Sequence, residues 1–290
     1  MSNSGILIAD AGSTKIDWCL VGPDGNESAR FETRGINAAI STADKMTTIF
    51  LSAKEYLSDS PEPSKIFYYG AGCATPDICN RVAGCLLEVW QDADCHVATD
   101  MLGAARALLG DKKGIACILG TGSNSCLYDG KDIIANIPPL GVILGDEGSG
   151  AVLGRRLIGD IYKGIAPDNL RRELNDAFGI PLSEIIRRVY REPDANRFLA
   201  SFVPFIKDNI SNPHIIMMVS EEFDRFFMRN VALYEDARIL PVNFIGSVAY
   251  NFQDLLKDSA ARNGFNVGII ERMPMAGLIA YHTQSSSLTN

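Results

Sequence analysis

ILIADAGSTKIDWCL (residues 6–20) and CILGTGSNSCL (residues 117–127) share one pattern, and this pattern decides the fold. In each stretch an apolar run is followed by a turn of glycine and hydroxyl residues, and then by a second apolar run. Apolar runs of this length on both sides of a glycine-rich turn indicate two strands joined in a hairpin. The sequence therefore predicts the same hairpin twice, about a hundred residues apart.

The stretches that follow the two hairpins also repeat a pattern. Each hairpin is followed by a further strand, predicted over 28–33 and 131–136, and then by alternating helices and strands. Such alternation is typical of an α/β fold. We expect two lobes with a cleft between them: an N-terminal lobe over 1–110, completed by the C-terminal helix 273–290, and a C-terminal lobe over 111–272 with a helical insert at about 147–235.

Composition argues against several classes of protein. The 290 residues suit two domains of ordinary size, and the formal net charge of −8 argues against a nucleic-acid or anionic-membrane partner. No apolar run is long enough for a membrane helix, and the N-terminus lacks the basic start of a signal peptide. Seven cysteines without CxxC spacing and three histidines without ligand spacing predict buried free thiols, no zinc site and a cytoplasmic protein.

Two further patterns have structural interpretations. Apolar residues at 219, 223, 226, 227 and 231 lie on one helical face, and we predict that they belong to the core. Three arginine pairs, at 155–156, 171–172 and 187–188, fall in predicted helices. We interpret these pairs as solvated faces rather than phosphate sites.

The two hairpin turns have the composition of a phosphate site. A turn rich in Gly, Ser and Thr presents backbone N–H groups and small hydroxyls, which together favour anions. Facing turns could hold the β- and γ-phosphates of a nucleotide, and Asp10 could hold Mg²⁺ through water, because Mg²⁺ commonly binds few carboxylates together with phosphates. The alternative is that both turns are ordinary tight hairpins. Finding both turns at the same place in a repeated unit favours the phosphate site.

Other nucleotide motifs do not fit. The chain has no GxxxxGK[ST], which excludes a P-loop enzyme. The stretch Gly148–Gly154 resembles GxGxxG, but Leu153 stands at the third glycine and no convincing strand precedes it. A dinucleotide fold is therefore disfavoured.

Five ordered motifs of the chain resemble a known group of proteins. The sequence is similar to the N-acetylglucosamine kinase-like branch of the sugar kinase/Hsp70/actin superfamily, within the BadF/BadG/BcrA/BcrD-type ATPase family. This resemblance covers nearly the whole chain, and it implies two ribonuclease-H-like lobes that close over ATP and a sugar. The motifs are DAGSTK (10–15), TDMLGAAR (99–106), ILGTGSN (118–124), LGDEGSG (144–150) and FIGSV (244–248).

Asp100 is the candidate catalytic base. It stands where a strand is predicted to end and a helix to begin, and we expect the helix N-terminus to favour its ionised form. An ionised carboxylate can orient a sugar hydroxyl and accept its proton. The alternative is a simple helix cap. The resemblance favours catalysis.

The resemblance also implies the residues that bind the nucleotide and the sugar. The phosphate residues are Gly12, Ser13, Thr14 and Lys15 in the first turn and Gly120, Thr121 and Gly122 in the second, while Gly246 and Ser247 resemble the loop on the adenosine side. For Lys15 the alternative, a solvent-exposed lysine that does not bind phosphate, is equally open. The sugar residues are Asn37, Asp100, Asn124, Gly141 and Asp146, with a helix start as the alternative for Asn37, a turn for Asn124 and a cap for Asp146.

One departure from the family concerns the sugar. Animal members carry a GWG-type segment before GDEGS, whereas this chain has Pro139-Leu140-Gly141. The missing aromatic residue leaves glucosamine and N-acetylmuramic acid open beside N-acetylglucosamine.

The resemblance predicts an ATP- and Mg²⁺-dependent kinase that phosphorylates an amino sugar, with N-acetylglucosamine as the expected acceptor. Its expected partner is this small molecule, with no nucleic acid and no membrane, and a homodimer stays open. Two alternatives remain. One is the ATPase activator of a 2-hydroxyacyl-CoA dehydratase, although its cysteine-bearing motifs are absent here. The other is a non-catalytic sugar or ATP sensor.

Overall fold

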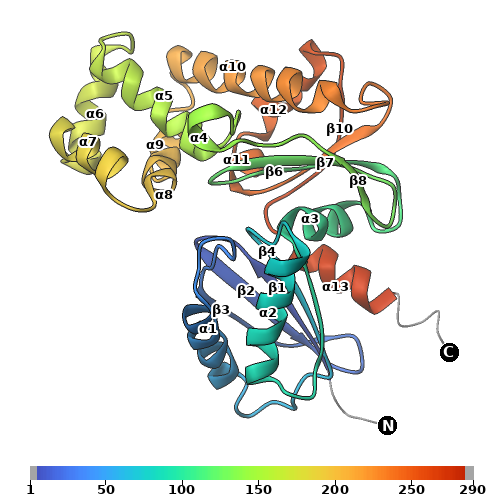
Figure 1. Ribbon diagram of the computed structural model, residues 1–290. Coiled ribbons are helices and arrows are strands. Elements are labelled where there is room, and N and C mark those ends of the chain that lie inside the picture. Colours follow the sequence, from blue (N-terminus) through green and yellow to red (C-terminus); the bar gives the residue numbers. More distant parts are fainter. Residues whose placement is uncertain (1–4, 285–290) are drawn as a thin grey trace. The chain divides into compact units, whose positions relative to one another are not determined.

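The computed structural model describes residues 5–284, and these residues form two compact units (Figure 1). The first unit contains the residues up to Gly110 together with those from Pro274 onward, and the second contains Asp111–Met273. No helix among the described residues has both the length and the apolar composition needed to span a membrane.

The first unit is built on a five-stranded sheet with the order β3-β2-β1-β4-β5. The strands β1 to β3 form an antiparallel meander, and β4 and β5 run parallel to β1. The sequence pattern predicts strands over 5–9, 16–21, 28–33, 66–72 and 95–98, and each observed strand begins and ends within two residues of these bounds. The strands are β1 (Ile6–Ala11), β2 (Lys15–Val21), β3 (Glu27–Arg34), β4 (Lys65–Gly70) and β5 (Asp94–Thr99).

Helices cover both faces of this sheet. The helices α1 (Ala43–Tyr56) and α2 (Pro76–Val89) pack on one face around Trp18 and Phe50. The helices α3 (Asp100–Leu109) and α13 (Met275–Gln284) lie on the other face, where Met275 and Leu278 join the core. In Figure 1 α13 lies beside α3, although 165 residues of the chain lie between the end of α3 at Leu109 and the start of α13 at Met275. The C-terminal helix therefore completes the first unit.

The second unit repeats this sheet. Its order is β10-β9-β6-β7-β8, again with an antiparallel meander followed by two parallel strands. Read in reverse, this strand order matches that of the first unit strand by strand. The duplication predicted from the hairpins is therefore confirmed, as is the α/β class. The strands are β6 (Gly114–Leu119), β7 (Ser123–Tyr128), β8 (Ile133–Asn136), β9 (Pro241–Ile245) and β10 (Asn266–Glu271).

The second unit carries most of its helices between β8 and β9. The predicted stripe lies on α10, where Phe223, Phe226 and Phe227 are fully buried, which confirms the core interpretation. The helices of this unit are α4 (Gly141–Leu144), α5 (Gly150–Tyr162), α6 (Asp168–Phe178), α7 (Leu182–Arg191), α8 (Ala195–Ala200), α9 (Val203–Asp208), α10 (Pro213–Arg229), the 3₁₀ turn η1 (Val231–Leu233), α11 (Ser247–Asn251) and α12 (Gln253–Arg262).

Capping residues mark where the helices begin. The sequence Thr75-Pro76 predicts a helix start with Thr as the cap; in the structure Thr75 accepts a hydrogen bond from the N–H of Ile78 at 3.4 Å, and Pro76 occupies the first turn. Apolar spacing predicts another helix over about 39–57, but this helix begins only at Ala43, because Thr42 caps it and the preceding residues turn back onto the carbonyl of Asn37. The last helix ends, within the described residues, at Gln284; residues 285–290 of the predicted helix 273–290 lie outside them.

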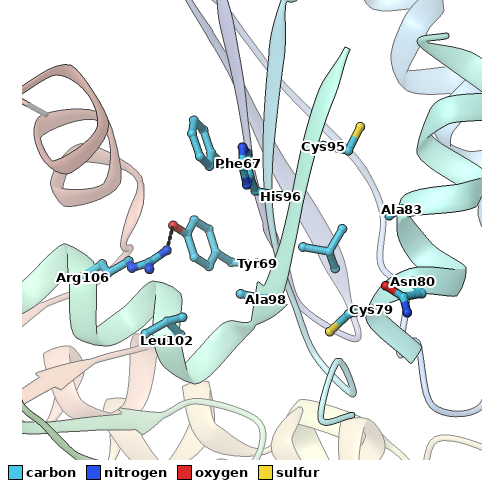
Figure 2. Close-up of a pocket in the computed structure, with 11 residues that line it drawn as sticks. Phe67, Tyr69, Cys79, Asn80, Ala83, Cys95, His96, Ala98, Leu102 and Arg106 are labelled. Carbon is cyan, nitrogen blue, oxygen red and sulfur yellow. Dashed lines mark hydrogen bonds between the residues drawn. The ribbon is translucent and has the colours of Figure 1, made fainter. Parts of the chain in front are cut away.

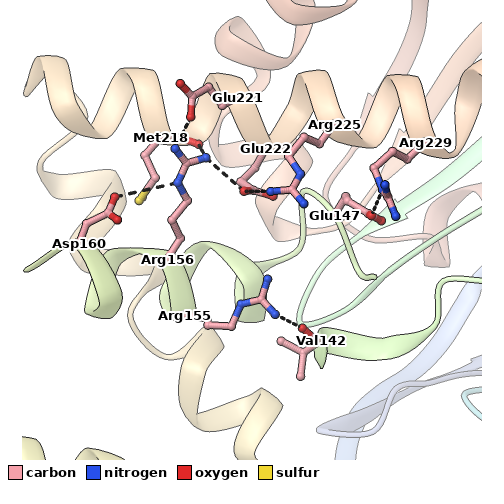
Figure 3. A network of polar contacts seen from close by, with 10 residues as sticks. All are labelled: Val142, Glu147, Arg155, Arg156, Asp160, Met218, Glu221, Glu222, Arg225 and Arg229. Carbon is pink, nitrogen blue, oxygen red and sulfur yellow. Dashed lines mark hydrogen bonds and ion pairs between the residues drawn. The ribbon is translucent and has the colours of Figure 1, made fainter. Parts of the chain in front are cut away.

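The interpretation of the arginine pairs as solvated faces is wrong at Arg156. Its guanidinium pairs with Glu221 and with the buried Glu222, and it lies within 4.0 Å of Asp160 (Figure 3). Sequence periodicity places Arg156 on α5 but says nothing of α10, which supplies the two glutamates.

A polar group inside the first unit joins α3, β4 and α13. The hydroxyl of Tyr69 accepts a hydrogen bond from Arg106 at 3.0 Å and lies 2.9 Å from Nε2 of His282 (Figure 2 shows the Tyr69–Arg106 pair). His282 also stacks on Phe67 with ring centroids 3.7 Å apart. Burial, with Arg106 and His96 as further causes, lowers the pKa of His282 to about 3. This histidine is therefore neutral when folded.

Replacing His282 with glutamine should flatten the acid dependence of stability. The folded protein keeps His282 neutral down to pH of about 3, whereas the unfolded chain protonates it below about 6.5, so the unfolded state binds more protons between these values. Stability is then lost as the pH falls through this window. Between pH 7.5 and 5 the unmodified protein should lose about 2 kcal/mol more than the variant. Urea unfolding at both pH values measures this difference, and equal losses would contradict it.

Candidate active site

The turn of the first hairpin is rigid and open to solvent. The N–H of Gly12 donates to the carbonyl of Lys15 at 3.0 Å, while Ser13 and Thr14 at the tip are exposed. Gly35, at the end of β3, donates its N–H to the carbonyl of Thr14 at 3.0 Å. The backbone of this turn is thus held from behind, and its hydroxyls point where a ligand could reach them.

Gly35 is a supporting residue that motif reasoning missed. A Cβ atom at this position would lie 2.3 Å from the carbonyl carbon of Thr14 and 2.4 Å from the nitrogen of Lys15, closer than real Cβ atoms approach backbone. Only glycine therefore lets the end of β3 pack directly under the turn. The ammonium of Lys15, which we considered as a phosphate ligand, forms an ion pair with Glu32 on β3 instead.

Asp10 lies at the end of β1 beside other acidic groups. In the sheet register its neighbours are Asp17 on β2 and Tyr69 on β4. Arg30 neutralises Asp17 through two hydrogen bonds of 3.1 and 2.7 Å. Burial, followed by the charges of Asp100 and Asp17, raises the pKa of Asp10 to about 7, against a smaller opposing effect of Lys15. Asp10 is thus a carboxyl group that would gain from a nearby cation.

Asp100 is the first residue of α3, as predicted. Its Oδ1 accepts hydrogen bonds from the N–H of Met101 at 2.9 Å and from the hydroxyl of Thr99 at 3.0 Å. The helix start favours the ionised form, as expected, because the hydrogen bond from the N–H of Met101 lowers the pKa of Asp100, but burial has the larger effect. Burial raises the pKa of Asp100, and these hydrogen bonds offset the increase only in part. A carboxylate with a raised pKa is better suited to accept a proton near neutral pH.

Asn37 lies in the loop between β3 and α1, partly buried. Its Oδ1 accepts a hydrogen bond from the N–H of Ala39 at 3.1 Å, so the oxygen shapes the local turn, whereas the helix start that we considered for this residue lies later, at Ala43. Gly72 packs against this amide, because a Cβ at position 72 would lie 2.3 Å from Oδ1. The contact orients the amide and leaves its NH₂ end as the group for a ligand.

The turn of the second hairpin is tied to the start of α5. Gly120 donates to the carbonyl of Gly122 at 3.0 Å, and the carbonyls of Gly120 and Thr121 accept from Gly150 and Ala151 at 2.8 and 3.0 Å. Ser149 caps α5 by accepting from the N–H of Val152 at 3.2 Å. The first N–H groups of α5 thus support the turn, and the remaining N–H groups of the turn are the ones available to phosphate.

Asp146 lies directly on this second turn. Its carboxylate accepts a hydrogen bond from the N–H of Ser123, and a Cβ at Gly122 would be 3.4 Å from its Oδ2. Burial raises the pKa of Asp146 to about 6, helped by Glu147 and opposed by Ser123 and Arg155. Its backbone is left-handed, with φ of 53°, which is uncommon for a residue other than glycine. A buried acid in a strained loop is typical of a functional position.

Gly246 lies next to the same turn. Its φ is 126°, and a Cβ there would lie 2.2 Å from the carbonyl oxygen of Leu119. The loop after β9 therefore comes as close to the end of β6 as backbone can. Ser247 follows at the start of α11 and is exposed. The structure thus brings Gly120–Gly122, Asp146, Gly246 and Ser247 together in the second unit.

Two predicted sugar residues have weaker support. The Oδ1 of Asn124 accepts from the N–H of Ser125 and from Nδ2 of Asn136, both at 2.9 Å, which fits the turn-stabilising alternative. Gly141 has φ of 74° and begins α4, where Ile143 is 86% exposed. Among the residues that the structure describes, no hydrogen bond joins Asn124 or Gly141 to the carboxylate of Asp146.

The acidic residues of the first unit fit the way in which proteins bind Mg²⁺. The described residues contain no group of three His, Cys, Asp or Glu side chains that could enclose a metal. The negative charge of Asp100, however, raises the pKa of Asp10, so the two carboxylates repel each other. A nearby cation would relieve this repulsion. Mg²⁺ normally binds one or two carboxylates and takes its other ligands from phosphates and water. The donor set therefore fits magnesium that arrives with a nucleotide.

Solved structures are similar to the whole chain, although no protein-family model and no curated protein matches it. A proposed N-acetylglucosamine kinase from Porphyromonas gingivalis is 45% identical, with a TM-score of 0.92 over 97% of this chain and 99% of that chain. A proposed N-acetylglucosamine kinase from Chromobacterium violaceum is 18% identical, with a TM-score of 0.77 over 97% and 99%. A ROK-family glucokinase from Streptomyces griseus, solved with glucose and AMPPNP, is 14% identical, with a TM-score of 0.64 over 97% and 99%.

The duplicated α/β units and these structures define the class as a sugar kinase with the two-lobe, actin-like ATPase fold, which confirms the predicted ribonuclease-H-like lobes. The two more distant structures show the fold alone. At 45% identity over nearly its whole length, the chain belongs to the N-acetylglucosamine kinase-like branch of the sugar kinase/Hsp70/actin superfamily.

Proposed function

We propose that this sugar kinase transfers the γ-phosphoryl group of ATP to a hydroxyl of an amino sugar, with N-acetylglucosamine as the acceptor. The observation that carries the proposal is a pair of carboxylates whose charges repel each other, Asp10 and Asp100, in the unit that also contains the DAGSTK turn. The name of the 45% identical relative supports the same sugar.

Asp100 is the proposed base. Phosphoryl transfer requires positioning, neutralisation of charge and a group that accepts the hydroxyl proton. Oδ1 of Asp100 is engaged with Met101 and Thr99, so we assign proton acceptance to Oδ2. Bound magnesium would neutralise the charge that develops on the phosphates, and Asp10 would hold it through a water ligand.

The turns and loops hold the two substrates. We assign phosphate binding to the backbone N–H groups and hydroxyls of residues 12–14 and 120–122, and the nucleoside side to Gly246 and Ser247. Lys15 has weaker support because it pairs with Glu32. For the sugar we assign the NH₂ group of Asn37 and the carboxylate of Asp146, with Asn124 and Gly141 as weaker candidates.

The bulk properties support a small-molecule partner in a reducing compartment. The net charge of −8 is unsuited to nucleic acid, and all seven cysteines are free. We infer a cytoplasmic enzyme whose partner is the sugar.

A panel of acceptors with Mg²⁺-ATP tests the function. N-acetylglucosamine, glucosamine, N-acetylmuramic acid, N-acetylmannosamine and glucose are compared at equal concentration by ADP release, with a sugar-free reaction as the baseline. We expect N-acetylglucosamine to have the highest kcat/KM of the panel, at least about tenfold above glucosamine and glucose, since a site built to hydrogen-bond the N-acetyl group rejects analogues that lack it. ADP release that no sugar stimulates would contradict a kinase. Preference for another sugar would contradict only the assigned acceptor.

A further inference from the structure

The conformation of Asp146 requires a support that the sugar and phosphate residues do not supply. Its backbone is left-handed, with φ of 53°, and glycines at 145 and 148 flank Asp146 and Glu147. A non-glycine residue in this region costs about 1–3 kcal/mol and persists only where its surroundings hold it. The hydrogen bonds of its backbone, to Pro139 at 2.8 Å and from Ser149 at 3.0 Å, fix only the two ends of the loop.

The next residue, Glu147, anchors this loop to the end of α10. The residue is buried, with 6% exposure, and its carboxylate faces Arg229 (Figure 3). Oε1 pairs with Nε of Arg229, the last residue of α10, and Oε2 accepts from Nδ2 of Asn230 at 3.3 Å. Gly148 packs on the same helix, because its Cβ would lie 3.3 Å from Cβ of Phe226. Two consecutive residues of the loop thus rest on one helix end.

The charge of Arg229 is necessary for this arrangement. A carboxylate at the C-terminal end of a helix faces the negative end of the helix dipole, and a buried carboxylate also loses hydration. Burial acts to raise the pKa of Glu147, but hydrogen bonds from its own backbone, Arg229 and Asn230 outweigh it and lower the pKa. Glu147 therefore stays ionised at the helix end, held by the cation of Arg229.

We propose that Glu147 and Arg229 are positioning residues that hold the carboxylate of Asp146 on the GTGSN turn, in the orientation that binds the sugar. The proposal rests on the assignment of Asp146 to the sugar. In this proposal neither Glu147 nor Arg229 touches a substrate. Arg229 acts through Glu147, and Glu147 acts through the backbone of Asp146.

The first test replaces Arg229 with glutamine. Releasing Glu147 should let Asp146 leave its orientation, and a displacement of about 1 Å in a substrate contact can cost about 10²-fold. We expect kcat/KM for the sugar to fall about 10- to 100-fold, while KM for ATP changes less than about threefold. Arg229→Lys keeps the charge and should restore most of the loss. If Arg229→Gln leaves the sugar parameters unchanged, or lowers those for ATP equally, the proposal is wrong.

The same helix offers a matched control. Arg225 lies one turn earlier on α10, is 56% exposed where Arg229 is 57% exposed, and also pairs with a buried glutamate, Glu222, at 3.5 Å (Figure 3). Glu222 lies on α10 itself rather than in the GDEGS loop, and it also pairs with Arg156 on α5. Arg225→Gln should therefore leave the sugar kinetics unchanged, although its effect on thermal stability should be similar. Equal kinetic losses in both variants would show a general effect of α10 and overturn the proposal.

A second readout does not depend on turnover. The charge of Glu147 raises the pKa of Asp146, while Ser123 and Arg155 act in the opposite direction. Glu147→Gln should therefore lower the pKa of Asp146, seen by carbon-13 NMR titration of its carboxyl group, and Arg225→Gln should not. If no sugar is phosphorylated, the proposed function fails while this titration still tests the coupling. An Asp146 titration that Glu147→Gln does not alter overturns the positioning role.

Discussion

Asp100→Asn should lower kcat by about 10²–10⁴-fold while Mg²⁺-ATP binds with unchanged affinity. Asparagine has nearly the same shape and can keep the contact of Oδ1 with the N–H of Met101, at 2.9 Å in the present structure. It cannot accept a proton from the sugar hydroxyl. The change therefore removes the chemistry and preserves the start of α3. Steady-state kinetics with the sugar, together with calorimetric titration of Mg²⁺-ATP, measures both parts.

Asp94→Asn is the matched control for this variant. Asp94 begins β5, the strand that ends at Thr99, and its carboxylate is exposed beside His96. Its loss should leave kcat unchanged. Turnover that survives in Asp100→Asn would exclude a base at this position and leave Asp100 as a helix cap only.

Asp10→Asn should inactivate the enzyme and at the same time stabilise the fold. Burial, followed by the negative charges of Asp100 and Asp17, raises the pKa of Asp10 from an ordinary value of 3.8 to about 7. Above that pH the folded protein holds an unfavourable negative charge, which only a cation relieves. Asparagine carries no charge, so the variant loses the proposed magnesium contact and also loses the repulsion. We expect kcat to fall by about 10²-fold or more, since metal-ion charge stabilisation contributes several kcal/mol.

The stability gain should depend on pH in a defined direction. Between pH 3.8 and about 7 the folded protein keeps the Asp10 proton that the unfolded chain has released, so stability falls as the pH rises through this window. Without magnesium or nucleotide, Asp10→Asn should be about 2–4 kcal/mol more stable than the unmodified protein at pH 7.5. Below pH of about 4 the two should be equal. Urea unfolding at these pH values decides the matter.

Asp17→Asn separates this effect from a general effect of removing acid. Asp17 is the cross-strand partner of Asp10, but its carboxylate already binds Arg30 at 2.7 Å. Removing it leaves Arg30 without its partner and should lower stability. If Asp10→Asn also lowers stability at pH 7.5, the proposed repulsion between Asp10 and Asp100 is absent.

Local pattern was sufficient for the elements and for the positions of the motifs. The apolar run predicts a strand over 114–119, and β6 occupies these residues; Thr75 and Thr99 cap the helices that follow them. These features depend on neighbours within about four residues, such as a cap and the N–H three positions later. The duplication followed from the same source, because both hairpins carry their pattern in consecutive residues.

The contacts that support the site could not be predicted in this way. Gly35 meets Thr14 across the sheet, and Glu147 meets Arg229 across 82 positions of the chain. No periodicity links such residues. Two features of the sequence could have indicated these residues. One is the glycine that follows a strand, Gly35, and the other is the second acidic residue of GDEGS, Glu147, to which we assigned no role.

What the amino-acid order alone established is the α/β class, the repeated hairpins and the acids at the ends of strands, because secondary structure and its punctuation arise from near neighbours. What required the folded chain is the charge state of those acids. For Asp100 the sequence revealed the helix start, which favours the ionised form, but not the burial, which outweighs this effect and raises the pKa. Burial and the approach of one carboxylate to another are sums over residues distant in the chain, so only the tertiary structure decides them.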